Sequence, residues 1–109
     1  SAMQERVRRV RATEPILDYV QRLVGETRES PYLTLGVSTR GAISLFRACQ
    51  ARAYLDGRDH ILPDDVKGLF LHVCSHRVMV KSFHDGAAER REEALNVLRE
   101  IIESTPVPL

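Results

Sequence analysis

The chain has 109 residues, and its 16 lysine and arginine residues nearly balance 15 aspartate and glutamate residues. This length suits one domain with a single core and is short for an enzyme with its own cofactor fold. The even charge gives no reason to expect binding to nucleic acid or to an anionic membrane. The apolar runs are too short to span a bilayer and the N-terminus lacks a signal-peptide pattern, so we expect a cytoplasmic protein.

The N-terminal end of the chain is expected to add little to the core. Ser1-Ala2-Met3 is typical of an expression-vector remnant, so residues 1–3 are assigned to that remnant and residues 4–109 to the domain. If so, the chain was cut from a longer protein. Val7 to Arg11 is expected to be a short extended segment that pairs with Val78-Met79-Val80, where the hydrophobic periodicity also becomes β-like.

The first predicted helix begins after Thr13, the expected N-cap, and tolerates Pro15 in its first turn. It should end near Arg28, because Ser30-Pro31 breaks the pattern. Apolar side chains recur on one face at helical spacing. These predicted core residues are Ile16, Leu17, Val20, Leu23 and Val24.

The second predicted helix, from about Thr39 to Leu55, begins with an arginine in an unfavourable place. Ser38 is the expected N-cap, which puts Arg40 and Gly41 in the first turn. A cation there opposes the helix dipole at a cost of about 0.3–1 kcal/mol, and glycine costs roughly another 1 kcal/mol in a helix interior. Free N–H groups, a guanidinium and no side chain at Gly41 would bind an anion well. The alternative is a surface arginine that extends into solvent.

The apolar side of this second helix is rich in small residues, which allow close backbone approach and predict a central position. They are Ala42, Ala48, Cys49, Ala51 and Ala53. Gly57 is the expected left-handed residue after the helix.

Two more helices complete the predicted fold. One opens at Pro63 and buries Val66, Leu69, Phe70 and Val73. The last runs from about Ala87 to Glu103 and buries Ala94, Leu95, Leu98, Ile101 and Ile102. The predicted fold class is therefore all-α, a small four-helix domain with room for one short two-stranded β-ribbon.

Few patterns in the chain fit catalytic chemistry. The sequence contains no GxxxxGK[ST] phosphate-binding loop and no recognisable set of nucleophile, base and orienting residue. Asp64 and Asp65 point about 100° apart on a helix, so they do not form a catalytic carboxylate pair. Their place in the first turn, where the helix dipole favours acidic residues, explains their presence. Cys49 and Cys74 lie in apolar helical contexts, so we expect buried thiols in a reducing compartment and no disulfide.

His72, Cys74 and His76 invite a test as metal ligands. On a helix the two histidines share a face, whereas Cys74 points nearly the opposite way, and no fourth ligand lies at a sensible spacing. We therefore predict no metal site. Cys74 is expected in the core and the histidines at the end of the helix.

A nucleic-acid-binding module is one alternative, suggested by the arginines near the N-terminus, which are Arg6, Arg8, Arg9 and Arg11. The helices around Asp56 to Leu62 could mimic a helix-turn-helix, but that turn is longer than usual. The second of these helices also starts with two acids, which would repel DNA. Nucleic acid is thus a disfavoured partner. A protein-binding helical adaptor with no link to a nucleotide is the other alternative.

Several motifs, in a fixed order over nearly the whole chain, resemble the MoxR-type AAA+ ATPases, specifically their C-terminal helical lid domain. They are Ile16-Leu17-Asp18-Tyr19-Val20 with Leu23-Val24 and Thr27-Arg28, Leu35-Gly36-Val37-Ser38-Thr39-Arg40-Gly41, Ala51-Arg52-Ala53-Tyr54-Leu55-Asp56-Gly57-Arg58-Asp59, Pro63-Asp64-Asp65-Val66, His76-Arg77-Val78 and Pro106-Val107-Pro108. The chain departs from a whole ATPase of this family because it holds no Walker A lysine, Walker B acid, sensor-1 residue or arginine finger.

The resemblance implies a role for Arg40. The matching family residue is the sensor-2 arginine, which reaches toward the γ-phosphate of ATP and couples hydrolysis to lid rotation. It implies that Arg40 is catalytic and that Ser38, Thr39, Arg40 and Gly41 form the nucleotide-binding set. ATP and Mg²⁺ would serve the full-length protein, and this fragment alone would bind no cofactor and be inactive. The implied partners are its own AAA+ core, neighbouring subunits of a chaperone-like ring, expected to be hexameric, and an unknown client. In this chain Arg40 should be exposed, without its partner.

Overall fold

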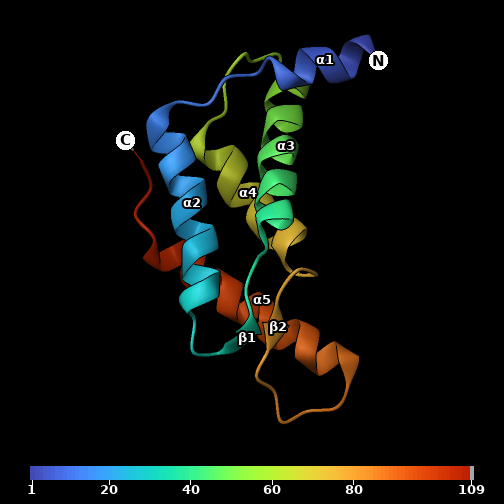
Figure 1. Cartoon of the computed structure of the whole chain (residues 1–109), viewed down its shortest axis with the longest axis vertical. Helices are drawn as coiled ribbons and strands as arrows, with labels where there is room; N and C mark the ends of the chain where they lie inside the picture. Colours follow the sequence, from blue (N-terminus) through green and yellow to red (C-terminus); the bar gives the residue numbers. More distant parts are fainter. Residues whose placement is uncertain (109) are drawn as a thin grey trace.

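The computed structural model describes residues 1–108, in which five α-helices and a two-stranded ribbon follow one another (Figure 1). Their order is α1 (Ala2–Arg8), α2 (Glu14–Glu29), β1 (Leu33–Leu35), α3 (Thr39–Leu55), α4 (Pro63–Cys74), β2 (Met79–Val80) and α5 (Ala87–Ser104). The predicted all-α class with a short ribbon is confirmed. The short helix α1 is additional, and it includes two of the residues assigned to the vector remnant.

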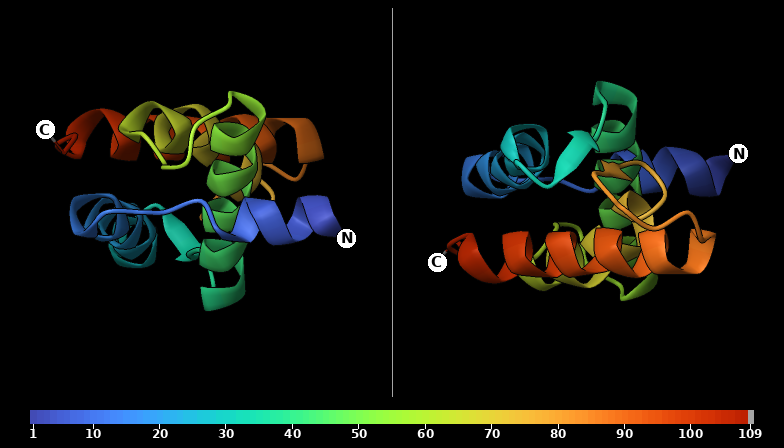
Figure 2. Two further views of the ribbon diagram at one scale, coloured as in Figure 1. Left: turned by 90° about the horizontal axis from the view of Figure 1, so that it is seen from above. Right: turned by 90° about the horizontal axis from the view of Figure 1, so that it is seen from below.

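The helices lie in two layers joined by α3. Figure 2 shows α4 and α5 on one side of the molecule, α1 and α2 on the other, and α3 running across both. Helix α3 packs against α1, α2 and α4, which confirms its predicted central position. Leu45, Cys49 and Ala53 lie one turn apart on α3, and each is fully buried. Two of these three are small, so the neighbouring helices can approach α3 closely.

The predicted core positions on the other helices are mostly buried. Val66 and Phe70 of α4 and Leu98 of α5 are fully buried. Leu17 was expected in the core and is 41% exposed. The core face of α2 instead carries Ile16, Tyr19, Val20, Leu23, Val24 and Thr27. Leu17 lies about 100° round the helix from Ile16 and falls outside this stripe. No helix within residues 1–108 combines the length and apolar character that crossing a membrane requires.

The ribbon forms, but the partner predicted for Val78 to Val80 was wrong. Strand β2 pairs antiparallel with β1, with Leu33 opposite Val80 and Leu35 opposite Met79. The backbone N–H of Lys81 extends the pairing by donating to the carbonyl of Tyr32 at 2.9 Å. Val7 to Arg11 does not reach this ribbon, because its first residues are in α1 and Arg11 bridges to His60 at the opposite end of α3.

The predicted helix ends agree with the structure. Ser38 precedes α3, and Gly57 follows it with φ +75°, the left-handed conformation that favours glycine. Pro63 opens α4, and Asp65 in its first turn accepts a hydrogen bond from the backbone N–H of Leu62 at 2.8 Å. Asp65 therefore does start the helix as predicted, although it is only 2% exposed.

Candidate functional site

The predicted site residues lie at the exposed start of α3. Ser38 caps the helix, because its Oγ accepts a hydrogen bond from the backbone N–H of Gly41 at 3.1 Å. Ser38, Thr39 and Arg40 are all exposed. Within residues 1–108, the Arg40 side chain makes no hydrogen bond or ion pair. The expected exposure of Arg40 is thus confirmed.

Gly41 is buried, so the expectation that its missing side chain leaves room for an anion was wrong. A Cβ atom at this position would lie 2.8 Å from Cγ1 of Val37 and 3.1 Å from Cδ of Arg77. Protein atoms therefore occupy the space that we expected to stay open for an anion. The Gly41 N–H is already bonded to Ser38, so Ser38, Thr39 and Arg40 offer the accessible groups of the predicted set.

A hollow of about 610 Å³ lies beside this helix start. It is lined by Arg28, Thr34, Leu35, Gly36, Val37, Ser38, Thr39, His76 and Arg77. The lining includes two arginines and a histidine and lacks a carboxylate, so its charge suits an anion. The positive end of the α3 dipole adds to the same field.

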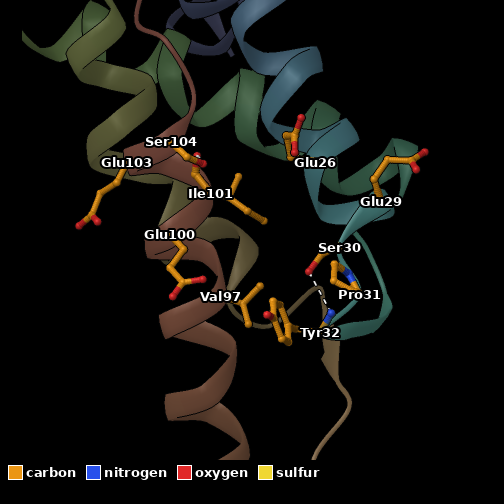
Figure 3. A pocket seen from close by; sticks show the side chains of 10 residues that line it. All are labelled: Glu26, Glu29, Ser30, Pro31, Tyr32, Val97, Glu100, Ile101, Glu103 and Ser104. Carbon is orange, nitrogen blue, oxygen red and sulfur yellow. Dashed lines mark hydrogen bonds between the residues drawn. The ribbon is translucent and has the colours of Figure 1, made fainter.

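A second hollow, of about 500 Å³, lies between the C-terminal ends of α2 and α5 (Figure 3). Tyr32, Val97 and Ile101 supply its apolar surface. The rim carries four carboxylates that form no ion pair with the residues that the structure describes, those of Glu26, Glu29, Glu100 and Glu103. These charges would repel a phosphate, whereas the hollow beside α3 has no carboxylate in its lining.

The three side chains considered as metal ligands, those of His72, Cys74 and His76, do not come together as a metal site. In the part of the chain that the structure describes, no group of three or more His, Cys, Asp or Glu side chains is placed to hold a metal ion. Cys74 is fully buried in the core, as predicted, whereas His72 and His76 are exposed at the end of α4. Cys49 and Cys74 are both free thiols.

Comparison with known proteins identifies the fold. Residues 25–100 match the family model of the AAA lid domain. The chain therefore belongs to the AAA lid domain family.

Individual relatives show which members of this family the chain is similar to. The chain is 38% identical over 107 residues to the uncharacterized protein YeaC of Bacillus subtilis, covering 98% of this chain and 32% of YeaC. It is 34% identical over 73 residues to protein MoxR of Methylorubrum extorquens, covering 67% of this chain and 21% of MoxR. The crystal structure of a "putative ATPase" from Cytophaga hutchinsonii superposes with a TM-score of 0.80 at 25% identity, covering 96% of this chain and 34% of that one.

These relatives place the chain among the lids of MoxR-like ATPases, as the sequence motifs predicted. The chain spans about a third of the length of YeaC and of the Cytophaga protein. The activity, substrates and partners of a whole ATPase are therefore proposals for this chain.

Proposed function

We propose that this domain closes over ATP bound to an AAA+ core, and that Arg40 contacts the γ-phosphate. The observation that carries the proposal is the position of Arg40, exposed and unpaired in the first turn of α3. A cation there costs the helix stability, at about 0.3–1 kcal/mol, without a compensating partner among residues 1–108. An anion supplied by another domain would provide that partner.

The proposed chemistry is electrostatic. The guanidinium of Arg40 would hold γ-phosphate oxygens and stabilise the charge that develops as the bond to the leaving phosphate breaks. The exposed hydroxyls of Ser38 and Thr39 can donate hydrogen bonds to the same oxygens. Hydrolysis would be coupled to lid movement because the guanidinium moves with the lid. Loss of the γ-phosphate would therefore release the lid.

The other requirements of hydrolysis would come from the core. Mg²⁺ prefers carboxylate and water oxygens, and no carboxylate lines the hollow beside α3, so the core would hold the metal. The core would also supply the Walker lysine and the residue that positions the attacking water. The isolated lid would then be inactive.

We also propose that the full-length protein assembles into a ring, expected to be hexameric, and acts like a chaperone on a client protein. The same proposal includes a cytoplasmic location, which the two free buried thiols support because thiols persist in a reducing compartment.

The test uses a full-length protein in which this lid is joined to its ATPase core. Arg40→Ala should lower steady-state ATPase activity and weaken ATP binding. Arg22→Ala is the matched control, because Arg22 is an exposed arginine of α2 that forms no ion pair within residues 1–108. If Arg40→Ala kept wild-type activity and ATP affinity, the proposal would be wrong. An upstream reading frame without a GxxxxGK[ST] loop would also contradict it.

A further inference from the structure

The last turn of α2 holds the loop that leads to Arg40. Arg28 Nε donates to the backbone carbonyl of Val37 at 2.8 Å. The backbone N–H of Val37 donates to Oγ1 of Thr27 at 3.0 Å. Two adjacent residues of α2 thus bind both backbone polar groups of a single loop residue.

The hydroxyl of Thr27 is fixed from its other side as well. It donates to the carbonyl of Val24 within α2 at 2.6 Å, while it accepts from Val37. Thr27 and Val37 are each 1% exposed, so water does not compete for these bonds. Breaking one of them would leave a buried polar group unsatisfied, which is costly.

The approach of the loop to α2 is as close as the backbone permits. A Cβ atom at Gly36 would lie 2.7–2.8 Å from backbone atoms of Thr27 and Arg28. Only glycine allows the loop to lie this close to the helix.

The held residue is next to the start of α3. Val37 directly precedes the N-cap Ser38, and its side chain packs against Gly41 in the first turn. The stem of Arg77 packs against Gly41 as well. The backbone on both sides of Arg40 is therefore fixed relative to α2 and to the segment after α4.

We propose that Thr27 and Arg28 are positioning residues for Arg40. By holding Val37, they set the place and direction from which the Arg40 guanidinium leaves the helix. The inference rests on the proposed function of Arg40 as the γ-phosphate ligand. Misplacement of a catalytic group by about 1 Å can cost on the order of 100-fold in rate, so loosening this loop should affect hydrolysis.

The first part of the test measures ATP hydrolysis by the full-length protein. Thr27→Val keeps the shape of the side chain and removes the hydroxyl, without changing charge. We expect kcat to fall by about 3- to 30-fold, and Thr27→Ser, which keeps the hydroxyl, to stay near the wild-type value. Arg28→Met, which removes the donor to Val37, should also lower kcat. Arg22→Met on the same helix should have no effect.

The second part asks whether the loss acts through Arg40. In an Arg40→Ala background, Thr27→Val and Arg28→Met should cause no further loss of kcat, because there is no guanidinium left to position. A merely structural role would reduce kcat by the same factor in both backgrounds and would overturn the proposal. Arg28→Met decides the question if Thr27→Val fails to fold.

The two proposals fail in different ways. If Arg40→Ala lowers kcat but neither α2 substitution does, the positioning role is wrong and the function of Arg40 stands. If Arg40→Ala itself has no effect, the γ-phosphate assignment falls, and the positioning role falls with it.

Discussion

Arg58 and Asp65 form a bidentate ion pair that joins the loop after α3 to the first turn of α4. Nη1 of Arg58 donates to Oδ2 of Asp65 at 2.8 Å, and Nη2 donates to Oδ1 at 2.7 Å. Oδ2 also accepts from the backbone N–H of Leu62. The planar fork of the guanidinium matches the carboxylate, so the geometry of this turn is well specified. The pair holds α3 against α4 at the end opposite to Arg40.

Asp65→Ala should destabilise the domain by about 2–3 kcal/mol, because hydrogen bonds to charged groups contribute about this much and a partly buried guanidinium would lose its partner. Urea unfolding of the 109-residue chain measures the change. Asp64→Ala is the matched control, since Asp64 is the exposed neighbour in the same helical turn. Equal effects of the two substitutions would show that only the helix-start charge matters.

Stability should fall in acid through the same carboxylate. Burial raises the pKa of Asp65, but the hydrogen bonds from Arg58 and from the Leu62 N–H outweigh it, so the pKa lies below its ordinary value of 3.8. A lowered pKa in the folded state means that the unfolded chain binds the proton more readily. The stabilisation is therefore complete above the ordinary pKa and is lost as the pH falls through the folded-state pKa.

Asp65→Asn should flatten this acid dependence. Urea unfolding at pH values from about 7 down to about 3 compares the variant with the wild type. The pKa of exposed Asp59 is also lowered, first by its hydrogen bond with His60 and then by Arg11, so some slope will remain in both proteins. An identical slope in the variant would exclude Asp65 as the source.

The two thiols should be unreactive until the protein unfolds. Burial raises the pKa of Cys49 and of Cys74 to about 12, and each is 0% exposed. The thiolate is the reactive form of cysteine, and at about pH 8 both thiols would be almost wholly protonated. Labelling with a thiol-specific disulfide reagent should therefore follow the fraction unfolded in urea. Labelling of the native protein at the rate of a free thiol would contradict the burial.

Much of the fold could be predicted from local signals. Ser38, Gly57 and Pro63 mark helix boundaries because caps and turns act on neighbouring residues, and the structure places the boundaries there. The pairing of the ribbon could not be predicted in this way. Leu33 and Val80 meet because α3 and α4 return the chain to the end of α2, a long-range consequence that periodicity alone does not contain.

The polar groups of the core were also beyond sequence reasoning. Gln50 resembles any polar helix residue in the sequence, yet it is 2% exposed and donates to the carbonyl of Val10 at 2.9 Å. The burial of Thr27 and Asp65 could not be predicted either, because a buried polar side chain needs a hydrogen-bond partner and the sequence does not show which residue that is. The unusual position of Arg40 could be recognised from the sequence, because its conflict with the helix dipole involves only neighbouring residues.

That local conflict predicts a trade between stability and function. In the isolated domain, Arg40→Ala should raise the free energy of unfolding by about 0.3–1 kcal/mol, because it removes a cation from the start of α3. Arg22→Ala, in the middle of α2, gives the matched baseline for losing an exposed arginine. A clear loss of stability in Arg40→Ala would mean that Arg40 has a structural partner within the domain.

The most direct test of the account is the single-turnover rate of γ-phosphate cleavage from ATP already bound to the full-length protein. This measurement separates the chemical step from ATP binding. Arg40→Ala should lower the rate by at least about tenfold, since removing a cation that stabilises transition-state charge costs this much or more. An unchanged rate would contradict the account, and Arg40 would then be only a surface arginine at the start of α3.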